Sequence, residues 1–96
     1  MKLLHLSLKE EYFRAIESGE KTEEFRLFNR YWRKRLTDLE DGAPKDFDGI
    51  VLTLGYPKSD DLSKRIERPW RGFEIKRITH PLFGKLPVRV FAIKVN

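Results

Sequence analysis

Apolar residues follow two different spacings along the chain, and each spacing predicts one kind of element. Alternation at every second position is typical of a strand, whereas apolar residues three and four apart are typical of a helix. The strand pattern occurs at 2–6, 21–28, 47–56, 70–79 and 88–95. The helix pattern occurs at about 8–18 and at 30 to about 37. The sequence therefore predicts a mainly β member of the α+β class, with about five strands and one or two flanking helices.

Signals at both ends define the first helix. Ser7 and Glu10 have the spacing of a capping box, which satisfies two free backbone donors at a helix start. An apolar stripe at every fourth position, including Tyr12 and Ile16, predicts the buried face. Gly19 stands where helices commonly end on a left-handed residue.

The later strands indicate a small, strongly curved sheet. The strand at 47–56 is apolar on both faces, which is typical of a central strand. Phe91 and Ile93 are expected in the core. Residues 58–69 are polar and allow a short helix capped by Ser59, an edge strand or a mobile loop. Closure into a small barrel would remove the exposed sheet edges, and we expect such a barrel.

The size and the net charge of the chain indicate its domain number and the kind of partner it favours. The chain has 96 residues, which is enough for one domain with one core, and we expect a single domain over 1–96. Twenty Lys and Arg against fifteen Asp and Glu give a net charge of +5. Such a surface favours acidic partners, nucleic acid first among them. A basic protein with no nucleic-acid partner is the alternative.

The composition also excludes several kinds of site and suggests a location. There is no cysteine, so disulfides and Cys-ligated zinc are excluded. No zinc motif, nucleophile elbow or phosphate-binding glycine loop occurs, and we expect no metal and no cofactor. No apolar run approaches the length that spans a bilayer, and the first residues become charged too early for a secretory signal. We therefore expect a cytoplasmic protein without a membrane partner.

In the stretch 19–36, charged residues occupy positions where a core strand would carry apolar ones. Such departures from the expected pattern occur most often at functional or strained sites. Thr22, Glu24 and Arg26 are predicted on one strand face, with Lys21 at the strand mouth. A hydroxyl, a carboxylate and two cations so placed can hold a polar ligand and move a proton. The alternative is a solvated strand face with a cross-strand ion pair.

Cations and aromatic rings alternate in the following helix. Single-stranded nucleic acid needs cations for its phosphates and rings for its bases. The alternative is a solvated helix face with Trp32 packed in the core. The predicted binding residues here are Arg26, Arg30, Tyr31, Arg33, Lys34 and Arg35.

Two further strand ends pair a ring with a cation. They contain Tyr56 with Lys58, and Trp70 with Arg68. Either they flank a ligand cleft or their rings cover the edge of the core. Of the two histidines, His5 is predicted as a core residue, and His80 precedes a proline in a turn.

Several of these residues resemble a known family. Tyr12, Phe13 and Ile16 lead into Gly19-Glu20-Lys21-Thr22, followed by Glu24 and Arg26. This order is similar to the opening signature of the ASCH family, named for activating-signal-cointegrator homology. Tyr31-Trp32 with Arg35, Gly55-Tyr56-Pro57 and His80-Pro81-x-Phe83-Gly84 resemble a phage-associated or bacterial branch of it. The signature covers about a fifth of the chain, and the remainder matches only in the order and size of its elements.

The resemblance implies a PUA-like fold, a small β-barrel with helices beside a cleft that binds RNA or a nucleoside. Some relatives are ribonucleases, and others remove an acyl group from modified cytidine by amide hydrolysis. In that second group the motif lysine, a strand threonine and a downstream glutamate are essential. Lys21 matches the lysine, and Glu24 stands where the threonine would be. Glu67 and Glu74 are candidates for the glutamate by composition.

These observations together predict an RNA- or nucleotide-binding domain with a basic cleft. If it is a hydrolase, Lys21 stabilises developing negative charge and Glu24 is the general acid/base. One alternative is a binding module without chemistry that reads a base or small nucleotide. Another is a protein-interaction domain whose basic helix docks an acidic partner.

Overall fold

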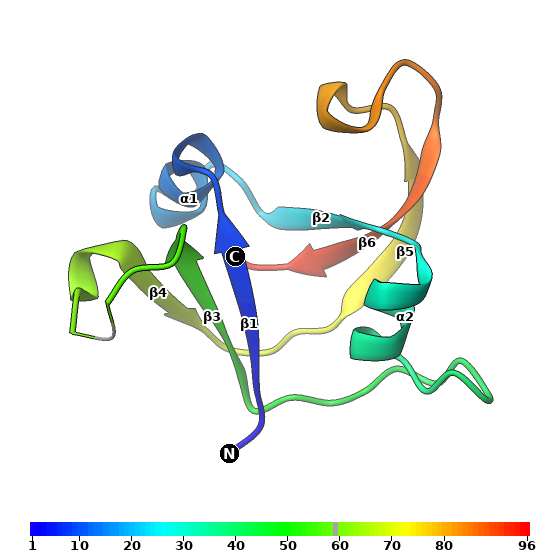
Figure 1. Cartoon of the computed structure of the whole chain (residues 1–96), viewed down its shortest axis with the longest axis horizontal. Coiled ribbons are helices and arrows are strands. Elements are labelled where there is room, and N and C mark those ends of the chain that lie inside the picture. Colours follow the sequence, from blue (N-terminus) through cyan, green and yellow to red (C-terminus); the bar gives the residue numbers. More distant parts are fainter. Residues whose placement is uncertain (59) are drawn as a thin grey trace.

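Six strands form two three-stranded sheets in the computed structural model, which describes all residues except Ser59 (Figure 1). The sheets have the orders β1–β3–β4 and β2–β6–β5. The strands are β1 (Leu3–Leu8), β2 (Glu23–Leu27), β3 (Gly49–Leu54), β4 (Arg65–Arg68), β5 (Phe73–Ile78) and β6 (Val88–Lys94). The helices are α1 (Glu10–Glu17) and α2 (Arg30–Leu36), with short 3-10 turns η1 (Leu62–Lys64) and η2 (Pro81–Phe83). The predicted mainly β, α+β class is confirmed.

β3 is the central strand of the first sheet, as its apolar sequence predicts. It pairs in parallel with β1, where Leu4 lies opposite Ile50 and Leu6 opposite Leu52, and antiparallel with β4. A parallel pair needs a long crossover rather than a tight turn. Here the crossover contains α1, β2 and α2, and it carries most of the candidate site residues.

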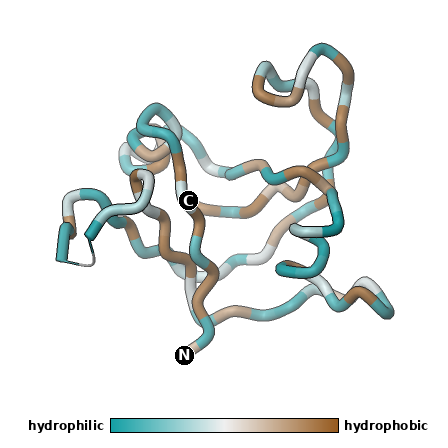
Figure 2. The backbone as a smooth tube through the Cα atoms, in the orientation of Figure 1, coloured by the Kyte–Doolittle hydropathy of each residue, from teal (hydrophilic) through white to brown (hydrophobic). Residues whose placement is uncertain are grey.

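β6 is the central strand of the second sheet. Phe91 and Ile93 are fully buried, as predicted. The rings of Phe28 and Phe73 each pack on Phe91 with centroids 5.0 Å apart. Residues of both sheets, α1 and α2 join in one hydrophobic cluster. Figure 2 shows hydrophobic residues along β1, β3 and β6, whereas α2 is mostly hydrophilic.

The start of α1 differs from the sequence prediction, whereas its end agrees. Ser7 belongs to β1, and the helix begins at Glu10. The Ser7 hydroxyl donates to the carbonyl oxygen of Gly55 at 3.0 Å, because the pairing of β1 with β3 continues through Leu8. The predicted capping box is therefore wrong. Gly19 follows the helix with a φ of 86°, which glycine adopts without steric cost.

Residues 58–69 contain η1 followed by the edge strand β4. The edge-strand alternative is thus confirmed for part of the segment, and it raises the strand count above the predicted five. Ser59, the predicted helix cap, lies outside the described residues. Within the described chain no strand pairing joins the two sheets, so the predicted closed barrel is not confirmed. None of the helices described is long and apolar enough to cross a membrane.

We predict that Phe91→Ala lowers the free energy of unfolding by about 3–5 kcal/mol, because it removes a buried ring that two others pack against. Leu86→Ala is the control: its side chain is 77% exposed, so we expect a change within about 0.5 kcal/mol. Urea unfolding followed by fluorescence measures both. A loss below about 1 kcal/mol for Phe91→Ala would contradict this arrangement of the core.

Candidate functional site

The guanidinium of Arg26, on β2, lies where the two sheets and α2 meet. Its Nη2 donates to the carbonyl oxygen of Ser7 on β1 at 3.0 Å and to Oε2 of Glu24 at 2.8 Å. Its central carbon lies 5.1 Å from the ring centroid of Trp32 on α2. Its Nε is buried and has no hydrogen-bond partner among the described residues. One side chain therefore connects both sheets to α2 and retains an unused donor.

Glu24 is a buried carboxylate held between two cations. Glu24 lies opposite Ile93 and Arg26 opposite Phe91, so both project from the face of the sheet that contacts the core. Nζ of Lys21 lies 3.7 Å from Oε1 of Glu24. The Glu24 side chain is only 10% exposed, and a buried charge is tolerated only where opposite charges and hydrogen bonds compensate it.

A β-bulge accompanies the convergence of Lys21 and Glu24. Residues three apart on a flat strand point to opposite faces. Here the Thr22 carbonyl accepts hydrogen bonds from the consecutive amides of Val95 and Asn96, at 2.9 and 3.4 Å, and two residues opposite one define a bulge. The side-chain amide of Asn96 also donates to the Lys21 carbonyl at 2.8 Å. Thr22 itself is exposed.

Aromatic rings surround the ammonium of Lys21. Nζ lies 4.7 Å from the ring centroid of Phe25 and 5.4 Å from that of Tyr12, within the range of cation–π attraction. The imidazole of His80 packs beside both rings, with centroids 6.1 Å from Tyr12 and 6.3 Å from Phe25. This packing restricts the Lys21 ammonium to a position beside Glu24.

A groove of about 290 Å³ follows the free edge of β2, and we call it the β2 groove. The described part of β2 pairs with β6 alone. The Phe28 amide donates to the Arg89 carbonyl on β6. Successive residues of a strand direct their backbone N–H and C=O groups to opposite sides, so those of Phe25, three residues earlier, face the groove. Tyr12 and Glu24 line the groove. Burial first, and the charges of Glu11 and Glu24 next, raise the pKa of Tyr12 above its ordinary value.

A second hollow of about 570 Å³ lies between β1 and α2, and we call it the arginine cleft. Arg35 donates from Nη2 to the His5 carbonyl at 3.2 Å and from Nη1 to the Tyr31 hydroxyl at 3.4 Å. Its guanidinium carbon lies 4.8 Å from the ring centroid of Trp32. Trp32 therefore contacts the guanidiniums of both Arg26 and Arg35, and all three side chains line the cleft.

The structure brings together only some of the predicted binding residues. Arg26, Tyr31, Arg35 and Tyr56 line the arginine cleft, and Tyr56 is almost fully exposed. Arg26 and Trp32 also line the β2 groove, so the two hollows adjoin.

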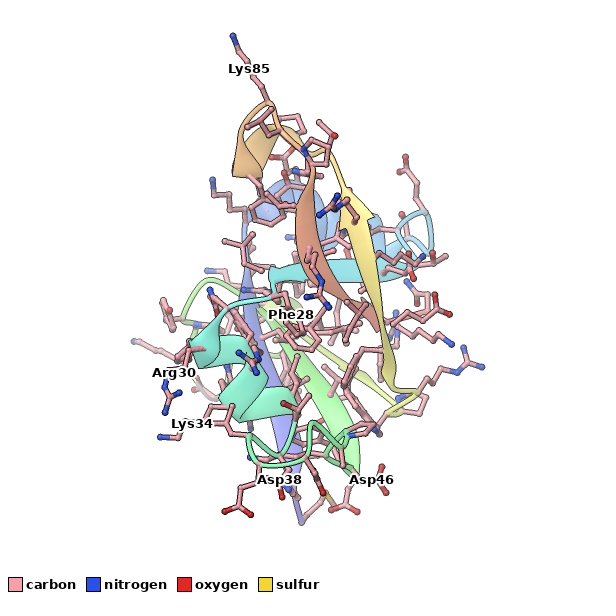
Figure 3. The ribbon with its side chains drawn as sticks, turned by 90° about the vertical axis from the view of Figure 1, so that its right-hand side faces the viewer. Phe28, Arg30, Lys34, Asp38, Asp46 and Lys85 are labelled. Atoms are coloured by element: carbon pink, nitrogen blue, oxygen red, sulfur yellow. The ribbon has the colours of Figure 1, made fainter. Side chains whose placement is uncertain are left out.

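Other predicted residues of α2 lie away from the cleft. Figure 3 shows Arg30 and Lys34 extending outward from α2. Arg33 contacts the ring of Phe28, at 5.3 Å, rather than Trp32.

The predicted residues after β3 are also separated. Arg68 lines a different hollow beside Pro69. Trp70 packs on Phe47 with ring centroids 4.8 Å apart, so its ring covers the core edge. Lys58 is exposed.

Sequence reasoning missed several residues of the two hollows. Ser7 and Tyr12 were predicted as helix cap and core stripe. His80, which packs beside Tyr12 but lines neither hollow, was predicted in a turn and formed part of the family resemblance. Trp32 was predicted as structural. His5, predicted as a core residue, is exposed, because it alternates with the buried Leu4 and Leu6 along β1. The alternation of leucines at 4, 6 and 8 was the available signal for the exposure of His5 and for the continuation of the strand.

Comparisons with protein-family models, with curated proteins and with solved structures found no match to this chain.

We predict that Glu24→Gln lowers the free energy of unfolding by about 1–3 kcal/mol, because it leaves buried cations without their charged partner. The coupling energy with Arg26→Met should exceed that with Lys21→Met, since the two ion-pair distances are 2.8 and 3.7 Å. Double-mutant cycles in urea measure both energies.

Glu17→Gln is the matched control, because it removes the same charge from an exposed pair with Arg14. We expect its effect to stay below about 0.5 kcal/mol. Equal effects of Glu24→Gln and Glu17→Gln would contradict a structural role for the buried pair.

Proposed function

We propose that the arginine cleft binds a nucleotide unit of single-stranded RNA. The observation that carries this proposal is the indole of Trp32 in contact with the guanidiniums of Arg26 and Arg35 beside an open hollow. Guanidiniums bind phosphate oxygens through a planar fork of donors, and aromatic faces stack bases without regard to sequence. The volume of about 570 Å³ lies within the usual range for small-molecule sites.

Two exposed rings add stacking surface to the cleft. Tyr31 is 61% exposed, and its ring lies edge-on to Trp32 at 5.1 Å. Tyr56 comes from the end of β3. Large aromatic side chains that remain in water are typical of binding surfaces, because burial in the core would otherwise be more favourable.

The resemblance to the ASCH family supports the same function. In this proposal the chain is a PUA-like domain of the cytoplasm that binds RNA or a modified nucleoside. Arg26, the last residue of the Gly19–Arg26 stretch of that resemblance, lines both the β2 groove and the arginine cleft. The closed barrel belongs to this proposal as well, and the bond from Arg26 to the Ser7 carbonyl supports a close approach of β1 and β2.

Hydrolysis of a bound nucleic acid or modified nucleoside is the second candidate function. The observation that favours it is the approach of Lys21 to Glu24 within 3.7 Å, next to the β2 groove. A carboxylate there can move a proton, and an ammonium can stabilise developing negative charge. Because Arg26 already engages one oxygen of Glu24, binding without chemistry ranks first.

For the binding function, we predict that Tyr31→Ala weakens affinity for a short single-stranded RNA by about 1–3 kcal/mol, the usual scale for one stacked base. Tyr31→Phe is the control, since it keeps the ring and removes only the hydroxyl that Arg35 contacts, and we expect near-normal affinity. Fluorescence anisotropy with labelled oligouridine measures both variants. If neither the ring nor the salt concentration affects RNA binding, a protein partner for the basic helix becomes the better explanation.

For the catalytic candidate, we expect Lys21→Met and Glu24→Gln each to lower turnover by about 10²-fold or more, the usual scale for one acid/base or charge-stabilising group. The measurement is product formation from RNA and acylated cytidine, analysed by chromatography. If wild-type protein forms no product while both variants alter affinity alone, the chain is a binder. If both variants melt at lower temperatures but keep wild-type turnover and RNA affinity, the pair is structural only.

A further inference from the structure

Two arginines contact the ring of Phe28, and a third lies opposite one of them in the sheet, all separate from the arginine cleft. The guanidinium carbons of Arg89 and Arg33 lie 4.2 and 5.3 Å from its ring centroid. Arg77 lies directly opposite Arg89 in the pairing of β5 with β6. None of these three arginines forms an ion pair within the described chain. We call Arg33, Arg77 and Arg89 the Phe28 patch.

The opposite face of the same sheet has paired charges instead. There Lys76 lies 2.9 Å from Glu23 and 3.8 Å from Glu74, and Lys94 lies 3.7 Å from Glu74. Directly opposed side chains on antiparallel strands are neighbours, and like charges at such positions are destabilising. The sheet therefore neutralises its cations on one face and leaves Arg77 and Arg89 unneutralised on the other.

The ring of Phe28 is a flat apolar surface on which Arg33 and Arg89 pack. This ring packs on the buried Phe91, so its position is fixed by the core. A guanidinium stacked on an aromatic face keeps the N–H groups at its edge free for acceptors. The three arginines come from α2, β5 and β6, so three different elements of the fold can present them to one anion without any rearrangement of the backbone.

The helix α2 separates this patch from the arginine cleft. Arg33 and Arg35 are two residues apart, about 200° around a helix with 3.6 residues per turn. Arg35 accordingly contacts Trp32 in the cleft, whereas Arg33 contacts Phe28. A helix is about 10 Å wide, and a stacked strand advances about 3.4 Å per nucleotide, so about three nucleotides are needed to cross it.

We propose that the Phe28 patch binds the phosphodiester backbone of the same strand whose base occupies the arginine cleft. The natural ligand is then a polynucleotide that crosses α2, rather than a free nucleotide. This inference rests on the proposed function, because it takes the cleft as the first point of contact. Arg30 is exposed at the start of the same helix.

The test compares a long and a short ligand on the double variant Arg77→Gln/Arg89→Gln. The long probe is a labelled oligouridine of about twelve nucleotides, within the usual site sizes of single-strand binders, and the short probe is a uridine dinucleotide. For the long probe we expect affinity to fall about tenfold or more at low salt. The slope of log affinity against log salt should fall by about 1.4, or about 0.7 for each lost phosphate contact. Dinucleotide affinity, measured by calorimetry, should be unchanged.

The matched control is Lys85→Gln/Arg71→Gln, which removes the same net charge at two exposed positions. Lys85 extends from the loop before β6, far from Phe28 in Figure 3. We expect this pair to change the salt slope little. Thermal unfolding checks that the Arg77→Gln/Arg89→Gln protein is folded, since the substitution relieves like-charge repulsion but removes the contact of Arg89 with Phe28.

Each result separates this inference from the function on which it rests. If the patch variant weakens the long probe no more than the control does, or weakens both probes equally, the Phe28 patch is not a backbone site. If the long probe depends on the patch but not on Tyr31, the patch binds a polyanion and the cleft proposal fails. If neither patch nor cleft variants affect either probe, both proposals are wrong.

Discussion

The hydrogen bond from Arg26 to the Ser7 carbonyl is the contact on which the site depends most. The two sheets share no strand pairing in the described chain, and this guanidinium connects the free edge of β1 with β2 at 3.0 Å. The same group compensates the buried charge of Glu24 and stacks on Trp32. The backbone N–H and C=O groups of an unpaired sheet edge must be hydrogen-bonded or covered. Here the Arg26 side chain, which lines both hollows, binds one of them, the Ser7 carbonyl.

Arg35 makes a similar contact with the same edge of β1. It donates to the His5 carbonyl, two residues before Ser7, so successive outward carbonyls of the strand each accept from an arginine. Both guanidiniums use only some of their donors on the protein and line the arginine cleft, so N–H groups that face the cleft can bind a ligand, whereas the buried Nε of Arg26 cannot. Structural and binding roles are therefore compatible in the same side chains, and stability and affinity measurements are both needed to separate them.

The distribution of carboxylates decides where the protein presents uncompensated positive charge. Glu23, Glu24 and Glu74 all lie close to lysines or arginines. The Phe28 patch has no such partner among the described residues, although the chain holds fifteen acidic residues. A net charge of +5 is modest, so it is this local separation, rather than the total, that gives α2 and its neighbouring strands a field suited to an anionic strand.

The sequence by itself determined the mainly β class, the central position of β3, the buried Phe91 and Ile93, and the glycine that ends α1. Periodicity and turn chemistry are local properties, and they report which side of an element is apolar. Only the tertiary structure decided that Ser7 continues β1, that Tyr12 and Phe25 flank Lys21, and that Arg33 and Arg35 contact different rings. The course of β1 depends on which strand edges meet around a long parallel crossover, and the approach of Lys21 to Glu24 accompanies a bulge opposite Thr22. No local pattern encodes either, because both arise from pairing between segments far apart in the chain.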